Sequence, residues 1–166
     1  MADNENDTSA ESAWRGDNGP TTREGGRMER QLILDFSAGD DRVRLIMQSD
    51  QPWTDWEIPT TIVADAGLFH GELTTSVRLT SLETLRDLLV SLDRGVGQPH
   101  HAYWQPTASL SLSFDLSPIG HVTVVVEIEE WESGASLKFS LGADQTYLPL
   151  WISQVKRVLQ HFFGDA

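Results

Sequence analysis

The chain contains no cysteine among its 166 residues. Without thiols, it can form no disulfide, no thiolate metal site and no cysteine nucleophile. It also lacks an apolar run approaching the roughly 18 residues that a membrane span requires, and residues 1–7 lack the basic and apolar regions of a secretory signal. We therefore expect a cytoplasmic protein.

Positive charge is scarce. Twelve Lys and Arg residues face 25 Asp and Glu residues, which gives a formal net charge of -13 and an isoelectric point near 4.6. Long-range repulsion argues against direct binding to nucleic acid or to an anionic membrane. A basic protein is the partner that this charge favours, and acidity that serves solubility alone is an equally good interpretation.

No motif specific for catalysis or ligand binding is present. The chain has no G-x-S-x-G, and Gly95-Val96-Gly97 is not followed by the helix that a phosphate-binding loop requires. His100, His101 and His121 come nearest to a metal-ligand set, but adjacent side chains of an extended segment point to opposite faces. We therefore expect no catalytic residue, no cofactor and no metal.

The chain divides into a tail and one domain. Residues 1–29 are polar and small, with an isolated Trp14 and no apolar period, which predicts a disordered acidic tail. The total length and the hydrophobic fraction of 39% suit one core, so residues 30–166 are predicted to form a single α+β domain.

Alternating apolar residues predict strands. In 110–116 and in 122–128 the large apolar side chains recur at every second position, which places them on one face. Pro59 suits an edge strand because it cannot donate to a ladder. Residues 95–101 read as a loop. The predicted strands are 32–36, 42–47, 56–64, 68–79, 108–116, 121–131 and 135–141, joined as antiparallel hairpins.

Two amphipathic helices are predicted. The first follows a capping box at Thr80-Ser81-Leu82-Glu83, carries a leucine stripe and ends at Gly95 in a left-handed conformation. The second has Pro149 in its first turn. The expected fold is an antiparallel sheet of about six to seven strands with one face covered by the two helices. Each half of the chain ends as strand, capped turn and helix, which a duplication would explain.

The densest acidic cluster consists of Glu127, Glu129, Glu130 and Glu132. On a strand, Glu127 and Glu129 would share a face, a spacing that a carboxylate-pair hydrolase could use. A solvated outer face needs fewer assumptions, because nothing near these residues would raise the pKa of one carboxylate. As a surface, these four residues are our predicted partner-binding site for a basic protein.

Tryptophan is abundant, with six residues. Five of them are expected to anchor strand ends and the helix–sheet seam, and any exposed ones would be interface anchors. These five are Trp53, Trp56, Trp104, Trp131 and Trp151.

Three segments carry a resemblance to a known family. They are Gly120-His121-Val122 opening a strand, the strand 137–141, and Ala143-Asp144-Gln145-Thr146-Tyr147-Leu148-Pro149 before a helix. In this layout, residues 31–163 resemble the WapI-like immunity proteins, which are small acidic bacterial antidotes to toxins delivered between competing cells. The resemblance implies that the chain binds and neutralises a cognate toxin without catalysis. It offers no contact residues to carry over, and an uncharacterised protein-binding or scaffold module is the alternative.

Overall fold

A computed structural model of the chain describes residues 31–48, 56–95 and 97–163. The predicted tail and Trp53 lie outside the described residues. The order of elements is four strands and a helix, repeated once. The elements are β1 (Gln31–Ala38), β2 (Asp41–Gln48), β3 (Glu57–Ala66), β4 (Phe69–Arg78), α1 (Leu79–Arg94), β5 (His100–Thr107), β6 (Leu110–Leu116), β7 (His121–Glu130), β8 (Ala135–Asp144) and α2 (Tyr147–Phe163).

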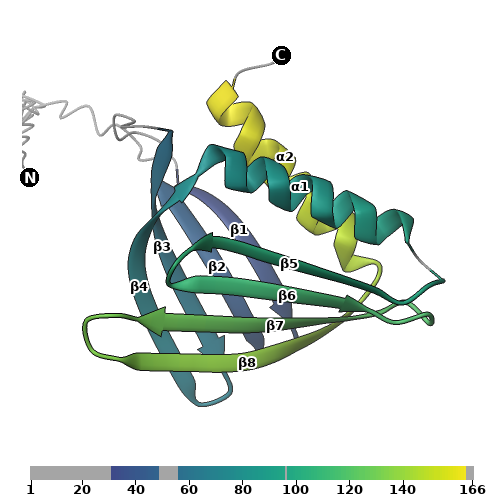
Figure 1. The fold of residues 1–166 in the computed structure, drawn as a ribbon, viewed down its shortest axis with the longest axis horizontal. Coiled ribbons are helices and arrows are strands. Elements are labelled where there is room, and N and C mark those ends of the chain that lie inside the picture. The colour runs from purple at the N-terminus through teal and green to yellow at the C-terminus, as the bar shows by residue number, and fades with distance from the viewer. Residues whose placement is uncertain (1–30, 49–55, 96, 164–166) are drawn as a thin grey trace, which may run out of the picture.

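The strands form two sheets. Each is a four-stranded antiparallel meander, in the orders β1-β2-β3-β4 and β5-β6-β7-β8, and the strands of one sheet run across those of the other (Figure 1). The α+β class is confirmed, but the predicted single sheet of six to seven strands is wrong. Alternation reveals which face of a strand is buried and does not reveal which strands share hydrogen bonds.

Strand β5 was not predicted. The sequence predicts a loop at residues 95–101 and a next strand that begins at residue 108. In the structure, β5 pairs with β6, and the first pair is His100 with Leu116. Only Trp104 of this strand is fully buried, and the ladder is irregular between Trp104 and Thr107. A strand with one buried side chain and a bulge has no alternating apolar signal.

The two helices lie side by side along one side of the sheet pair (Figure 1). Helix α1 contacts β5, the first strand of the second half, and α2 contacts β1, the first strand of the first half. Each helix therefore also packs on the half of the chain to which it does not belong. The repeated element order agrees with the similarity between the halves that the sequence suggested.

An aromatic cluster joins both sheets to α2 at the centre of the core. The ring of Trp151 lies 5.3 Å from that of Phe36 in β1 and 6.4 Å from that of Phe114 in β6, and the two phenylalanine rings are 6.1 Å apart. All three side chains are buried. Such edge-on contacts add about 0.5–1.5 kcal/mol per pair beyond the area they bury. A single core thus spans both sheets and both helices.

Three local predictions are wrong. Helix α1 begins one residue before the expected capping box, its N-cap is Arg78, and no side chain caps it. Gly95 ends α1 with a φ of -82°, which is not left-handed, and its N–H bonds the carbonyl oxygens of Ser91 and Leu92. Pro59 lies in β3, which is an interior strand; the pairing of β2 with β3 ends at Met47 and Thr60, so the missing proline N–H breaks no ladder bond there.

The tryptophans divide into two groups. Trp104 and Trp151 are buried, as expected of anchors, whereas Trp56 and Trp131 are exposed. Within the described residues, neither helix has the length and apolar character needed to cross a membrane.

Candidate partner-binding surface

The four predicted partner-binding glutamates lie at the end of β7 and in the turn that follows it. Glu127 and Glu129 lie on the outer face of the second sheet, opposite Lys138 and Ser136 of β8. Glu127 forms an ion pair with Lys138. The strand alternates, so Glu130 projects to the other side, and Glu132 lies exposed in the turn. The structure therefore distributes the cluster over two faces.

A groove opens on the side of Glu130. It has a volume of about 310 Å³ and lies between the β3–β4 hairpin of one sheet and the β7–β8 hairpin of the other. No helix residue lines it. The lining residues are Ile62, Phe69, His70, Gly71, Glu72, Leu73, Ile128, Glu130, Ala135, Ser136 and Leu137.

The groove exists because the apolar faces of the two sheets are incompletely filled at this end. Leu73, Ile128 and Leu137 are only partly buried there. Gly71 supplies no side chain to fill the gap, and a Cβ placed on it would meet no atom within 4 Å. The groove is thus an open end of the core, lined mainly by carbon.

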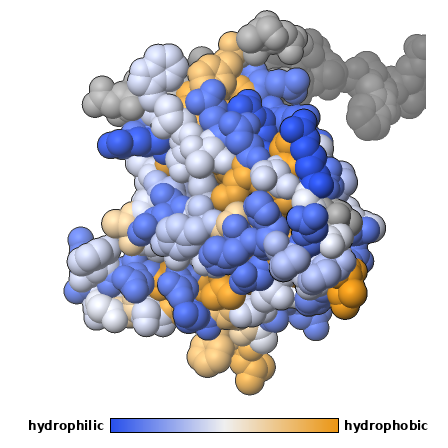
Figure 2. Space-filling model, turned by 45° about the vertical axis from the view of Figure 1, so that its right-hand side comes forward, coloured by the Kyte–Doolittle hydropathy of each residue, from blue (hydrophilic) through white to orange (hydrophobic). Residues whose placement is uncertain are grey.

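Exposed apolar side chains stand at the two hairpin turns beside the groove. Leu68 is 102% exposed, Phe69 is 69% exposed and Trp131 is 74% exposed. Figure 2 shows apolar atoms protruding at the lower tip of the molecule, the end that the β3–β4 turn occupies in Figure 1. Large apolar side chains grouped next to an apolar hollow are typical of protein interaction sites.

The groove carries negative charge. Glu130 belongs to its lining and projects to this side of the sheet, and Glu132 lies exposed in the turn that follows. Glu72 also belongs to the lining, but it alternates with Gly71 and Leu73 and so projects to the outer face of β4. The lining contains no Lys or Arg. Its one histidine, His70, already faces the carboxylate of Asp65, with 2.6 Å between Nδ1 and Oδ1. A cation approaching the groove would therefore meet the carboxylate of Glu130, which no basic residue of the lining neutralises.

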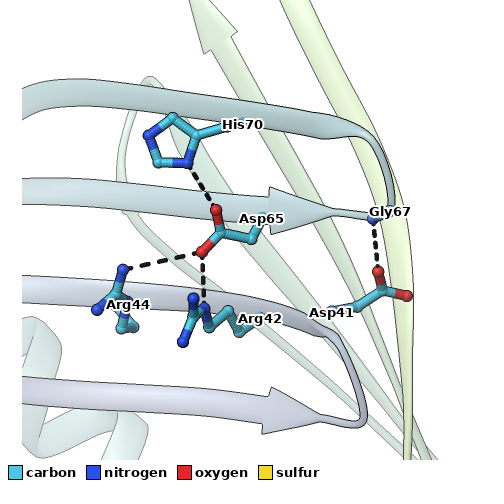
Figure 3. A network of polar contacts seen from close by, with 6 residues as sticks. All are labelled: Asp41, Arg42, Arg44, Asp65, Gly67 and His70. Atoms are coloured by element: carbon cyan, nitrogen blue, oxygen red, sulfur yellow. Dashed lines mark hydrogen bonds and ion pairs between the residues drawn. The ribbon is translucent and has the colours of Figure 1, made fainter.

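The outer face of the first sheet is different, because its charges are paired with one another (Figure 3). Oδ2 of Asp65 accepts a hydrogen bond from Arg42 Nε at 2.7 Å and lies 3.8 Å from Nη2 of Arg44. Asp41 accepts the backbone N–H of Gly67 at 2.8 Å and so fixes the β3–β4 turn. This cluster orders the end of the sheet that bears Leu68 and Phe69.

Two carboxylates have a lowered pKa. Hydrogen bonds from His70 and then Arg42 hold the pKa of Asp65 below its ordinary value, and the same contact with Asp65 raises the pKa of Arg42. Hydrogen bonds from the hydroxyl and backbone N–H of Thr146 lower the pKa of Asp144, just before α2. Both carboxylates are stabilised as anions, which suits a structural role rather than proton transfer.

The histidines considered as metal ligands have different neighbours. His101 Nδ1 is 2.7 Å from Oδ1 of Asp115 on the neighbouring strand, and His121 lies against Gly142 in β8. Within 31–48, 56–95 and 97–163, no group of three or more His, Cys, Asp or Glu residues is arranged to hold a metal ion.

The apolar part of this surface was not predicted from the sequence. Leu68 and Phe69 follow Gly67, a turn residue with a φ of 58°, and two consecutive large apolar residues at a turn are a signal that could have been used. Gly71 gave no signal, because a glycine inside a strand does not reveal whether the space beside it is open.

Comparison with known families gives a clear match. A model described as the immunity protein WapI-like family matches residues 28–162. The chain belongs to this family. The match covers both repeats of the fold and confirms the family that the segments around Gly120, Leu137 and Asp144 suggested. No curated protein matches the chain.

Several solved structures are similar to this chain. WHY1 from Arabidopsis thaliana is 12% identical, with a TM-score of 0.50 over 81% of this chain and 86% of that one. MRP1/MRP2 from trypanosoma bruciei is 9% identical, with a TM-score of 0.49 over 84% of this chain and 91% of the other. A guideRNA-binding protein complex bound to a gRNA is also 9% identical, with a TM-score of 0.49 over 84% and 97%. At 12% identity, the likeness to WHY1 shows a similar fold and no common function.

Proposed function

We propose that this chain is a bacterial immunity protein that acts in the cytoplasm, where it binds a cognate toxin domain and neutralises it without catalysis. Membership of the WapI-like immunity family carries the proposal. An apolar groove with exposed hairpin residues beside it supports the proposal, because it supplies the desolvated centre that a tight protein interface needs.

The proposed toxin is basic. The chain has a formal net charge of -13, and the groove presents Glu130 with no lysine or arginine in its lining. Such a field raises the rate at which a positively charged partner is encountered and repels acidic proteins. A nuclease toxin would fit, since enzymes that act on nucleic acid present basic surfaces to their substrate.

We do not propose nucleic acid as a partner, although one protein of similar fold is bound to a guide RNA. Nucleic-acid affinity depends on lysines and arginines that displace counterions from phosphates. In this chain Arg42 and Arg44 of the first sheet lie beside Asp65, and Lys138 of the second sheet pairs with Glu127. These three basic side chains on the outer faces are thus engaged within the protein.

A protein-binding or scaffold module with another partner is the second candidate. The exposed Leu68, Phe69 and Trp131 support it equally well, because they indicate an interface without naming its partner. A hydrolase using Glu127 and Glu129 is less well supported, since Glu127 is paired with Lys138.

Co-expression tests the proposal directly. The terminal domain of a secreted toxin encoded beside this chain's gene should kill cells alone and spare them when this protein is present. A catalytically inactive form of that domain should form a stable complex with the full chain. Killing despite good expression, or a stable complex only with a different neighbour, would favour the scaffold module. Turnover of a substrate that Glu129→Gln abolishes would establish an enzyme instead.

A further inference from the structure

The groove between the two hairpins has the features of a pocket for one part of a protein partner. Its volume of about 310 Å³ is at the small end of the range of about 300–1,000 Å³ found for small-ligand pockets, which is enough for a large side chain. It is open to solvent and lined by partly buried apolar residues of both sheets. It does not belong to the packed centre around Trp151.

We propose that this groove receives an aromatic or large aliphatic side chain of the toxin, and that a Lys or Arg residue next to that side chain pairs with Glu130. The proposal rests on the immunity function proposed above and deepens it by naming the surface and the chemistry of the segment that it takes.

Gly71 leaves space for an apolar side chain of the partner. Its position in β4 faces the hollow, and a side chain there would enter open space without touching another atom. Leu73 and Ile128 on either side expose part of their surface in the free protein. A partner side chain would remove this surface from water, which is the main source of affinity at the centre of protein interfaces.

The charge comes from Glu130. This residue lies at the end of β7, and its side chain alternates to the groove side of the second sheet. The hydroxyl of Ser133 donates to Oε2 of Glu130, an interaction that leaves the negative charge in place. An acidic or neutral segment would leave this carboxylate uncompensated at the rim, whereas a basic one pairs with it.

The hairpin turns provide the surrounding contact. Leu68, Phe69 and Trp131 are among the most exposed large apolar side chains of the described residues. Placed around a filled groove, they would exclude water from the side chain and from the ion pair, which strengthens both.

Filling the groove tests the proposal. The probe is the inactive terminal domain of the adjacent toxin gene, and its affinity is measured by calorimetry with the full-length chain. Gly71→Phe should weaken binding at least about 30-fold, because the new ring occupies the place of the partner's side chain. Leu68→Asp is a second variant at a fully exposed site and should also weaken binding. Ile119→Asp, at the exposed β6–β7 turn, is the matched control and should bind as the unaltered chain does.

The outcomes separate the two proposals. If the unaltered chain does not bind the toxin domain, the proposed function fails. If it binds, and Gly71→Phe and Leu68→Asp bind equally well while remaining folded by circular dichroism, the groove proposal alone is overturned. Two further results overturn it by assigning the groove to another occupant: a homodimer in the absence of toxin that Gly71→Phe dissociates, or hydrogen-exchange protection of residues 1–30 that the same variant removes.

A short peptide tests the chemistry without the toxin. In a titration of the isotope-labelled full chain, the peptide Ac-Lys-Lys-Trp-Lys-Lys-NH2 should shift the amide signals of Gly71, Leu73 and Leu137. The peptides with Glu in place of Lys, and with Ala in place of Trp, should leave these signals in place. Equal shifts with all three peptides would contradict the proposed pairing of an apolar side chain with a basic neighbour.

Discussion

The indole of Trp104 in β5 donates a hydrogen bond to the carbonyl oxygen of Ser81 in the first turn of α1, at 2.8 Å. Trp104 is 2% exposed and Ser81 is half-buried, so this bond has a buried donor and joins the first half of the chain to the second. A hydrogen bond from a buried donor stabilises the fold more than one from an exposed donor, because removing the acceptor would leave a desolvated polar group without a partner.

Trp104→Phe is accordingly expected to destabilise the protein by about 2 kcal/mol, since it removes the hydrogen bond and part of a buried ring system. The midpoint of urea unfolding, read by circular dichroism, measures the loss. Trp131→Phe is the matched control, because Trp131 is exposed and a change there should stay within about 0.5 kcal/mol. Equal stability of the two variants would show that the bond to Ser81 contributes nothing.

Asp65 predicts a pH dependence of stability. The pKa of this carboxyl is lowered in the folded state, so the folded protein favours the anion more than the unfolded chain does. Its contribution is complete above the ordinary carboxyl pKa of 3.8 and is lost as the pH falls through the lower folded value. Asp65→Asn should therefore be less stable than the unaltered chain at pH 7, and the difference should shrink at acid pH.

Unfolding curves between pH 7 and pH 2 measure that difference. Arg42→Gln is the control. It should lower the free energy of unfolding less in the Asp65→Asn background than in the unaltered chain, because its hydrogen-bonded partner is already gone there. A stability gap that stays constant down to pH 2 would contradict the assignment.

Gly120 predicts a backbone cost of substitution. It has a φ of 82°, and a Cβ on it would lie 2.6 Å from Oε1 of Gln145, the end of an exposed, flexible side chain that can turn away. Gly120→Ala should therefore destabilise the protein by roughly the 1–2 kcal/mol that left-handed backbone costs an L-residue. Gly134→Ala is the control, since Gly134 has a φ of 68° and open space beside it, so it reports the backbone cost alone.

Adding Gln145→Ala should change the stability of this variant little. Thermal or urea unfolding of Gly120→Ala with and without Gln145→Ala is the measurement, and both forms should match Gly134→Ala within about 0.5 kcal/mol. If Gln145→Ala restores stability to Gly120→Ala, the cost at Gly120 comes from the side chain that it meets and not from the backbone.

Charge reversals separate the two faces of the predicted glutamate cluster. Glu130→Lys lies in the groove lining and should weaken toxin binding about tenfold, mainly through a slower association rate and a flatter salt dependence. Glu127→Lys lies on the outer face, where Glu127 is paired with Lys138, and should change affinity far less. Surface plasmon resonance at two salt concentrations measures both, and a larger effect at Glu127 would place the interface on the outer face.

The sequence predicted the parts of the fold that depend on regular burial. The recurrence of large apolar residues at every second position, as at Leu112, Phe114, Val124 and Val126, identified their strands, and all four side chains are buried. Strand β5 escaped because Trp104 is its only fully buried residue. The division into two sheets escaped because it depends on which strands exchange hydrogen bonds, a long-range relationship that local periodicity does not contain.

The candidate site was predictable only in part. Charge density drew attention to Glu130, because acidic residues are visible in the sequence wherever they lie. The hollow depends on Gly71 meeting nothing and on the hairpins of two separate sheets lying side by side. Both are properties of the assembled molecule, so no pattern within either hairpin could have revealed them.

The cross-packing of the helices has a consequence for synthesis on the ribosome. Helix α2 is the last of the described elements, and its Trp151 and Gln154 reach back to Phe36 and to the backbone N–H of Asp35 in β1, the first strand to be made. The leucine stripe of α1 likewise lacks its neighbour until α2 has emerged. Incomplete chains that stop before residue 147 would expose this apolar surface to chaperones and proteases, so a cell would accumulate this protein only as a finished product.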